Sequence, residues 1–328
     1  MRILVTGGAG YIGSHATRLL ERAGHDVWVF DNLVLGHRRA VDSRRLIVGD
    51  LLDRPSLTKV LHDHQIEAVL HFAAFSQVPE SVSDPARYYQ NNVGGSLNLL
   101  EAMRACGVRR IVFSSTAATY GIPEHLPITE QEPQRPINPY GFCKLVIEQA
   151  LHDYATAYGL GYAALRYFNA AGASPDGDIG EDHQPESHLI PLVLQAALGQ
   201  RPQITIFGDD YPTPDGTCIR DYIHVDDLGQ YHVRALECLQ PGAELRLNLG
   251  IGRGYSVQAV IEACRRVTGK TIRIARGARR PGDPPELVAD PAAAQRLLGV
   301  HTGLSDLETI VETAWKWHQS HPHGYNDR

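Results

Sequence analysis

Short hydrophobic runs alternate with longer amphipathic stretches through the first half of the chain. The runs are rich in Val, Ile, Leu and Phe, and they predict strands at 3–6, 27–30, 46–48, 68–72, 110–115 and 162–167. Helical patterns lie between most of them, at 12–23, 91–105 and 140–158. Buried strands separated by helices indicate a parallel sheet that is covered on both faces. The predicted fold class is therefore α/β, with a Rossmann-type doubly wound parallel sheet.

The pattern changes after residue 171. Residues 172–186 are rich in Gly, Pro, Asp and Ser and are expected to form a loop. Helical patterns follow at 188–198, 256–268 and 305–318, with short strands at 204–207, 245–249 and 271–275. We expect a smaller C-terminal α/β lobe that binds the substrate. The chain is therefore predicted to have two domains, 1–171 and 172–328. Segments near 225–249 are candidates to cross back to the first domain.

The composition indicates which class of protein this is and which kinds of partner it can bind. The 328 residues are 43% hydrophobic and 21% charged, as is typical of a globular protein with a sizeable core. A net charge of −6 argues against a broad grip on nucleic acid or on an anionic membrane. No apolar run approaches the length of a membrane span, and the N-terminal residues predict a first strand and not a signal peptide.

The five cysteines are widely spaced and no pair has CxxC spacing. Neither a disulfide framework nor a zinc site is therefore indicated, and a cytoplasmic location is expected. His71, His224 and His232 lie in apolar or mixed segments without the spacing of metal ligands. We expect these histidines to be structural, and no metal site is predicted.

A glycine-rich turn follows the first predicted strand. Gly7, Gly10 and Gly13 stand where that strand passes into the first helix. Glycine allows the tight turn and lets the backbone approach a pyrophosphate at the helix N-terminus. A glycine triplet alone is weak evidence, but its place in a strand–turn–helix unit indicates a dinucleotide site.

Acidic residues follow the second and third predicted strands. Asp31 is placed to accept hydrogen bonds from an adenine ribose and to repel a 2′-phosphate, which favours NAD over NADP. Asn32 follows it directly. Asp50 and Leu51 come after the third strand, where an acidic side chain can hold the adenine amino group.

A Tyr-x-x-x-Lys pair supplies candidate chemistry. Tyr140 and Lys144 are one helical turn apart and therefore project from the same face. A free phenol has a pKa near ~10, and a lysine cation and a positive nicotinamide ring both lower it. Ser114 and Thr116 end a neighbouring strand, where substrate would lie. Spacing alone fits an ordinary solvated helix equally well; the glycine-rich turn favours the catalytic interpretation.

These motifs resemble those of the extended short-chain dehydrogenase/reductase family. The resemblance extends from end to end to the UDP-hexose 4-epimerases of that family. It rests on the glycine-rich turn, Thr116, Tyr-x-x-x-Lys, Asn91-Asn92-Val93, Arg166-Tyr167-Phe168-Asn169, Gly180-Glu181-Asp182, Arg220-Asp221-Tyr222-Ile223-His224-Val225, Arg280-Pro281-Gly282-Asp283 and Trp315-x-Trp317.

The resemblance implies inversion of the C4 hydroxyl of UDP-glucose or UDP-galactose through a 4-keto sugar, with NAD as cofactor. It assigns Tyr140 as the base, Thr116 as its hydrogen-bonding partner at the sugar oxygen, and Lys144 as the residue that holds the nicotinamide ribose. It further implies a homodimer formed by the helices that start near residues 91 and 140. Leu97, Leu100 and Leu151 fit such an interface, and they fit burial against the sheet equally well.

The resemblance also implies two sets of binding residues. The cofactor set is Gly7, Gly10, Tyr11, Ile12, Gly13, Asp31, Asn32, Asp50, Leu51, Phe72, Ala73, Asn92, Ser114, Tyr140, Lys144 and Phe168. The substrate set is Thr116, Tyr140, Asn169, His188, Leu189, Thr205, Phe207, Arg220, Arg280 and Asp283. In the second set, Arg220 and Arg280 match a pyrophosphate clamp, which suits the forked guanidinium group.

Three positions depart from the pattern of the family. Ser76 stands where some members carry Lys, and His188 stands where several carry Asn. Leu287 borders the implied sugar pocket and is intermediate in size between the aromatics that exclude N-acetyl groups and the small residues that admit them. Epimerisation of UDP-N-acetylhexosamines or UDP-pentoses therefore stays open.

Two further functions compete with epimerisation. A nucleotide-sugar 4,6-dehydratase needs an acid and a base, and its usual Asp-Glu pair is replaced here by Ala117-Ala118. A non-catalytic NAD-binding regulator on the same scaffold tends to lose the Tyr or the Lys, and both are present. The sequence therefore favours an NAD-dependent isomerase that acts on a UDP-sugar.

Overall fold

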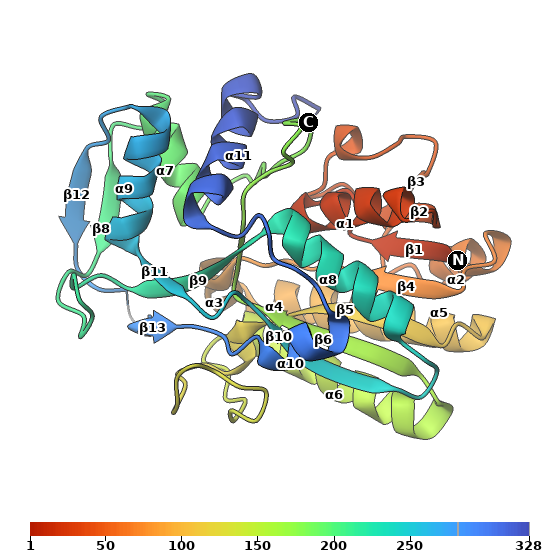
Figure 1. Cartoon of the computed structure of the whole chain (residues 1–328). Helices are drawn as coiled ribbons and strands as arrows, with labels where there is room; N and C mark the ends of the chain where they lie inside the picture. The colour runs from red at the N-terminus through yellow and green to blue at the C-terminus, as the bar shows by residue number, and fades with distance from the viewer. Residues whose placement is uncertain (281, 328) are drawn as a thin grey trace.

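Seven parallel strands form the central sheet of the computed structural model, which describes residues 1–280 and 282–327. Their order is β10-β6-β5-β4-β1-β2-β3 (Figure 1). The strands are β1 (Arg2–Thr6), β2 (Asp26–Asp31), β3 (Leu46–Val48), β4 (Ala68–His71), β5 (Arg110–Thr116), β6 (Gly161–Tyr167) and β10 (Glu244–Leu249). The predicted Rossmann-type parallel sheet is confirmed.

Helices cover both faces of this sheet. One face packs against α1 (Tyr11–Arg22), α8 (Val225–Cys238) and α10 (Ala292–Leu298). The other packs against α2 (Arg54–Asp63), α5 (Gly95–Cys106) and α6 (Pro139–Tyr158). Alternate residues of one strand serve the two layers, because successive side chains point to opposite faces. In β1, Ile3 and Val5 belong to the first layer and Leu4 to the second.

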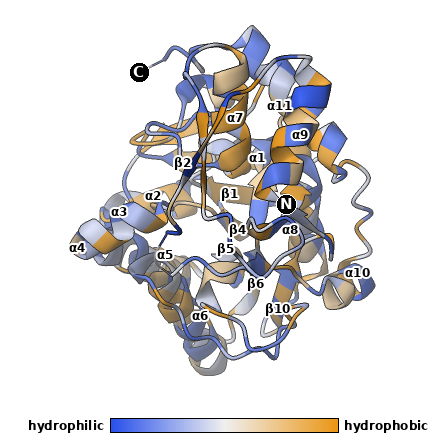
Figure 2. Ribbon diagram, turned by 90° about the vertical axis from the view of Figure 1, so that its left-hand side faces the viewer, coloured by the Kyte–Doolittle hydropathy of each residue, from blue (hydrophilic) through white to orange (hydrophobic). Residues whose placement is uncertain are grey.

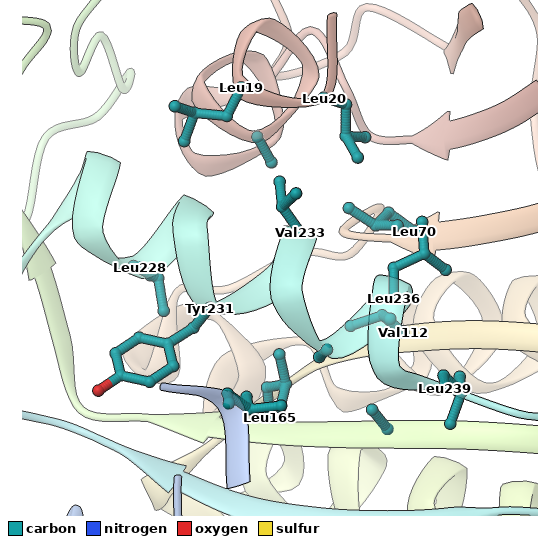
Figure 3. Packing of buried hydrophobic residues seen from close by; sticks show 14 of the residues in the cluster. Leu19, Leu20, Leu70, Val112, Leu165, Leu228, Tyr231, Val233, Leu236 and Leu239 are labelled. Carbon is teal, nitrogen blue, oxygen red and sulfur yellow. The ribbon is translucent and has the colours of Figure 1, made fainter. Parts of the chain in front are cut away.

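Helix α8 shows how the first layer is built (Figure 3). Leu228, Val233 and Leu236 of α8 are buried in this layer. They lie between α1, represented by Leu19 and Leu20, and the sheet, represented by Leu70, Val112 and Leu165. Burial of a leucine side chain contributes about 1.5–3 kcal/mol. This layer therefore fixes the N-terminal glycine turn, which leads into α1, against the strand ends.

A smaller lobe lies over the carboxyl ends of the central strands. It has one sheet of β7 (Asn169–Ala171), β9 (Ile219–His224), β11 (Gly254–Ser256) and β13 (Glu286–Leu287), and a second of β8 (Ile204–Phe207) and β12 (Ile274–Gly277). Its helices are α7 (Leu189–Ala197), α9 (Val257–Thr268) and α11 (Leu307–Ser320), which share one hydrophobic core. Figure 2 shows both hydrophilic and hydrophobic residues along α9 and α11, as expected for helices with one face in that core.

Short helical segments complete the connections. They are α3 (Val78–Ser83), α4 (Pro85–Tyr88), the 3₁₀ turns Arg38–Ala40 and Ala117–Thr119, and a π-helical stretch, Tyr89–Gly94. The last of these precedes α5, so the helix predicted from residue 91 begins with a π-helical turn. The strand predicted at 271–275 lies slightly later, at 274–277.

Segments from the second half of the chain complete the first sheet. Strand β10 pairs in parallel with β6, and α8 packs against α1.

Of the described residues, none belongs to a helix that is both long and apolar enough to cross a membrane. Two of the three leucines offered for a dimer interface, Leu100 and Leu151, are buried in the core, and only Leu97 is exposed. The burial alternative therefore holds for these two.

A buried ion pair joins α6 to the sheet. The guanidinium of Arg166 on β6 donates to both carboxylate oxygens of Glu148 on α6, from Nε to Oε1 at 3.0 Å and from Nη2 to Oε2 at 2.5 Å. The two side chains are only 3% and 4% exposed. Ser115 Oγ donates to Glu148 Oε1 at 2.5 Å, and Arg166 Nη1 donates to Tyr120 Oη at 2.8 Å. Each charge is thus held by several partners.

We expect Glu148→Gln to lower the free energy of unfolding by about 3–5 kcal/mol, since it leaves a buried guanidinium without its counter-ion. Chemical denaturation measures this change. The matched control is Glu308→Gln, which breaks the pair of Arg266 and Glu308, each 58% exposed. The control should change stability by less than about 1 kcal/mol. Equal effects of the two variants would contradict the assignment.

Candidate functional site

One large cleft opens where the two lobes meet, beyond the carboxyl ends of the central strands. Its cavity volume is about 840 Å³. Most of the residues predicted from the sequence to bind a ligand line it, and they come from both lobes. Parallel α/β sheets commonly bind their ligands at this edge. The cleft is therefore the candidate functional site.

The glycine turn between β1 and α1 fits a dinucleotide. A Cβ on Gly13 would lie 2.1 Å from the carbonyl oxygen of Gly7, and one on Gly7 would lie 2.4 Å from the amide nitrogen of Ala73. Gly7 also has φ of +70°, a conformation that glycine adopts without strain. Gly10 caps α1 without a side-chain hydrogen bond. The first N–H groups of α1 are thus left for an anionic ligand such as a pyrophosphate.

The acidic end of the cleft is fixed by backbone hydrogen bonds. Asp31 Oδ2 accepts from the amide of Ala9 at 3.0 Å, and its Oδ1 accepts from the amide of Leu33 at 2.8 Å. Burial raises the pKa of Asp31, and these two hydrogen bonds oppose the rise. Asn32 Nδ2 donates to Asp50 Oδ2 at 3.0 Å, so these two predicted residues contact each other. All three side chains line the cleft.

Tyr140, Thr116 and Lys144 meet at the middle of the cleft. Asn138 caps α6 by accepting a hydrogen bond from Gly141, and Tyr140 therefore lies in the first turn of that helix. The Lys144 ammonium lies 5.9 Å from the centre of the Tyr140 ring and donates to the carbonyl oxygen of Ser114 at 2.7 Å. The predicted convergence of these side chains is observed.

Burial dominates the protonation of both groups. It lowers the pKa of Lys144 to about 8. It raises the pKa of Tyr140 far above the ordinary value, and a hydrogen bond with Thr116 only partly opposes this. From the sequence we expected a lowered pKa for the phenol, and the protein by itself does not lower it. The expectation also depended on the positive charge of an oxidised nicotinamide, which lowers the pKa of a nearby phenol.

The far end of the cleft carries the charged residues of the smaller lobe. Arg220 pairs with Asp283, and its Nη1 donates to the carbonyl oxygen of Ile219 at 2.7 Å. The Arg280 guanidinium lies 4.2 Å from the centre of the Phe207 ring. Asp283 was predicted to hold a ribose, but in the protein alone its carboxylate is engaged by Arg220. Pro281 of the same motif lies outside the described residues.

His188 stands at the wall of the cleft beside two carboxylates. Its Nδ1 lies 2.8 Å from Glu181 Oε1 and 2.9 Å from Glu186 Oε1. Burial alone would lower the pKa of His188, but the two carboxylates outweigh it and raise the pKa well above the ordinary value. The two carboxylates thus favour a positive charge beside them, whereas the amide that His188 was expected to replace is neutral.

Four predicted residues do not line the cleft. Asn92 is buried, and its amide exchanges two hydrogen bonds with the backbone of Phe75, while its neighbour Asn91 lines the cleft. Leu189 packs against the core of the smaller lobe. Thr205 and Phe207 lie on β8, and Phe207 reaches the site only through its contact with Arg280.

Several lining residues were missed by the sequence argument. Tyr167 accepts a hydrogen bond from Ser114 Oγ at 3.0 Å and stands beside Tyr140. Glu181 and His183 come from the loop before α7. Tyr167 and Glu181 belong to motifs of the family resemblance, which was the available signal. His183 had none, because loop residues carry no periodic pattern.

Part of the cleft lining is apolar. Ala117, Ala118, Phe168 and Leu287 belong to the lining, as does Ser76. Phe168 and Leu287 pack against the same small hydrophobic cluster. No carboxylic acid follows Thr116, so the acid–base pair of a dehydratase has no counterpart at this place.

The chain is similar to known proteins over nearly its whole length. The sequence model of the group described as "NAD dependent epimerase/dehydratase family" matches residues 3–250. The chain is 52% identical to the UDP-glucose 4-epimerase of Lacticaseibacillus casei, over 100% of both chains. The crystal structure of UDP-glucose 4-epimerase from Brucella ovis in complex with NAD matches with a TM-score of 0.92, 52% identity and coverage of 96% and 97%. The enzyme from Bifidobacterium longum in complex with NAD+ and UDP matches with a TM-score of 0.94, 37% identity and coverage of 99% and 100%.

The raised pKa of Tyr140 predicts a ligand-dependent titration. In dinucleotide-free protein, the ultraviolet difference between wild type and Tyr140→Phe should show no phenolate below about pH 10. Loading with an oxidised nicotinamide dinucleotide should move the ionisation to lower pH, because added positive charge favours the phenolate. The control is Tyr158→Phe, whose difference spectrum should not respond to loading. A phenolate at Tyr140 near pH 7 in the empty protein would contradict this account.

Proposed function

The chain belongs to the NAD dependent epimerase/dehydratase family, and we propose that its cleft interconverts UDP-glucose and UDP-galactose. It is an NAD-dependent isomerase that inverts C4 of the sugar. The observation that carries this conclusion is the convergence of Tyr140, Thr116 and Lys144 between a dinucleotide turn and two arginines. Residues 1–171 hold the dinucleotide and 172–328 the nucleotide sugar, with 225–249 returning to the first lobe.

The first lobe would hold NAD. The turn of Gly7, Gly10 and Gly13 at the N-terminus of α1 would hold its pyrophosphate, and Asp31 would hold its adenine ribose. Asp50, Asn32 and Leu51 would border the adenine, and Lys144 would hold the nicotinamide ribose. When bound, NAD would supply the acceptor and donor of the C4 hydride.

Tyr140 moves the proton. Its phenolate oxygen takes the proton of the sugar 4-hydroxyl as the C4 hydride departs, which leaves a 4-keto sugar. The sugar turns in the cleft, and the same phenol returns the proton to O4 when hydride re-adds. The hydroxyl of Thr116 holds O4 and hydrogen-bonds the phenol. The overall reaction is redox-neutral, since hydride and proton both return to the substrate.

The diphosphate end and the sugar end of the substrate need different kinds of contact with the protein. Arg220 and Arg280 are charged residues at the cleft wall and suit the diphosphate, to which guanidinium groups bind with two parallel hydrogen bonds. Arg220 exchanges part of its contact with Asp283 for the diphosphate, which frees Asp283 for the uridine ribose. The sugar end, bordered by Ala117, Phe168 and Leu287, offers few fixed polar partners and permits rotation.

A homodimer and a cytoplasmic location complete the proposal. Leu97 on α5 and Phe142 on α6 are exposed apolar residues on neighbouring helices, and Tyr89 contacts Phe142. We infer that these side chains belong to one contiguous apolar patch, which is the kind of surface that marks a protein interface. The five cysteines are free thiols, as is typical of proteins in a reducing compartment.

Tyr140→Phe should lose about 10²–10⁴-fold in the rate of conversion of UDP-galactose to UDP-glucose, because it removes the proton carrier. A time course without added oxidant measures the product, and UDP binding should be unchanged. The matched control is Tyr158→Phe at the other end of α6, which should keep wild-type activity.

UDP-N-acetylglucosamine should be assayed in parallel, since Leu287 leaves the size of the pocket intermediate. Failure of folded, NAD-loaded wild type to convert UDP-galactose would refute the UDP-hexose assignment. Full activity of Tyr140→Phe would refute the role of the phenol and leave the substrate assignment standing.

Leu97→Glu should convert a dimer to monomers, because it places a charge in the proposed apolar interface. Analytical ultracentrifugation measures the change. Leu297→Glu, which alters an equally apolar exposed leucine on α10, is the control and should remain dimeric. A monomeric wild type, or equal behaviour of the two variants, would refute the proposed interface.

A further inference from the structure

Four potential metal ligands gather in the loop that precedes α7. They are Glu181, His183, Glu186 and His188, and one ligand atom from each lies within 4.8 Å of the others. His183 Nδ1 is 3.0 Å from Glu181 Oε1 and 3.9 Å from Glu186 Oε2. His188 Nδ1 lies within 2.9 Å of both carboxylates. Within residues 1–280 and 282–327, this is the one group of its kind.

The two carboxylates of this group need a positive charge near them. The side chains of Glu181 and Glu186 are each 5% exposed, so two carboxylates share a poorly solvated space. Each imidazole turns its Nδ1 toward them. Either both rings are protonated and the group is an ion-pair network, or the rings are neutral and a positive ion lies between the four ligand atoms. Buried carboxylates without a cation are strongly disfavoured.

The donor set favours the second arrangement. Two imidazole nitrogens and two carboxylates match the ligands that Zn²⁺ takes in four-coordinate sites, and bonds of about 2.0–2.2 Å place such donors a little over 3 Å apart. Three donor pairs of the group are 2.8–3.0 Å apart and a fourth is 3.9 Å apart, so an ion between them requires the three closer pairs to move slightly apart. Glu186 Oε1 is further oriented by the backbone amides of Ser187 and His188, at 2.7 and 2.8 Å. Such outer hydrogen bonds hold a metal ligand in place.

The loop is anchored to both lobes. Trp317 Nε1 on α11 donates to the carbonyl oxygen of Glu181 at 3.0 Å. The ring of Tyr11, at the start of α1, meets that of His183 edge to face at 6.1 Å between centroids. An ion held by this loop would therefore fasten α11 to the first turn of α1. It would also add positive charge to the cleft wall, since Glu181, His183 and His188 line the cleft.

We propose that Glu181, His183, Glu186 and His188 form a binding site for one divalent transition-metal ion of the zinc type. The site stiffens the loop between β7 and α7. It needs neither substrate nor turnover, and it stands or falls independently of the proposed epimerase activity.

The first test is calorimetric titration of Zn²⁺ into the chelator-treated, NAD-loaded full chain. We expect one equivalent to bind, with release of protons from the imidazoles, so that the apparent enthalpy depends on the ionisation enthalpy of the buffer. We also expect the melting temperature to rise with the concentration of free Zn²⁺. Co²⁺ in place of Zn²⁺ should give the visible absorption of a site with nitrogen and oxygen ligands.

His183→Gln and Glu186→Gln are the variants, and either one should abolish this equivalent. Glu186→Gln keeps an oxygen that accepts the two backbone hydrogen bonds. Two variants are used so that the test still stands if one of them does not fold. The control is the double variant His321→Gln, His323→Gln, which removes the histidines of another loop and should bind as wild type does.

Absence of Zn²⁺ and Co²⁺ binding to wild type would overturn the proposal and leave the group as an ion-pair network. Loss of binding in the control, with retention in both loop variants, would equally overturn it.

Discussion

The buried pair of Arg166 and Glu148 is the constraint on which the position of the candidate site depends. Helix α6 carries Tyr140 and Lys144 near its first turn and Glu148 one turn further along. Because Glu148 is held by a guanidinium from β6 and a hydroxyl from β5, the helix can neither rotate nor slide against the sheet. Tyr140 is thereby kept over the ends of the same two strands. A pair of this kind gives little net stability, but it costs much to break.

The cleft combines two electrostatic environments. In its first lobe, the glycine turn leads into the N-terminus of α1, where backbone N–H groups carry partial positive charge. In the smaller lobe, Arg220 and Arg280 provide full charges. Between them lies Tyr140, in a place so poorly solvated that its phenol stays neutral in the empty protein. The chemistry of this residue is therefore conditional on the ligand that lies beside it.

Local features of the site could be predicted from the sequence, and features that depend on distant partners could not. The strand–glycine–helix unit and the Tyr140–Lys144 spacing follow from short-range periodicity, so both were found. The pair of Arg220 and Asp283 joins residues that are distant along the chain, and neither segment contains a pattern that predicts this ion pair. Asn91 and Asn92 are adjacent, and a π-helical turn decides which of them faces the cleft.

The same limit explains three further features that the sequence did not settle. The pKa of Tyr140 depends on how completely other segments bury it, and periodicity does not report that quantity. The four side chains proposed to bind a metal before α7 follow neither the period of a helix nor that of a strand, so their meeting point depends on the path of the loop. Leu100 and Leu151 fitted two environments equally well until the packing of α5 and α6 against the sheet was known.

Strand β10 has a consequence for the way the chain is made. During synthesis β6 leaves the ribosome about eighty residues before β10, the strand that pairs with its outer edge. Translation at roughly 5–20 residues per second makes this delay about 4–16 s. Throughout it the edge of β6 is open, and for most of it the layer that α8 covers is bare, because α8 is made only shortly before β10. Nascent chains in that interval carry the surface that promotes association between unfinished sheets, so the yield of folded protein should depend on translation speed and on chaperones at the ribosome.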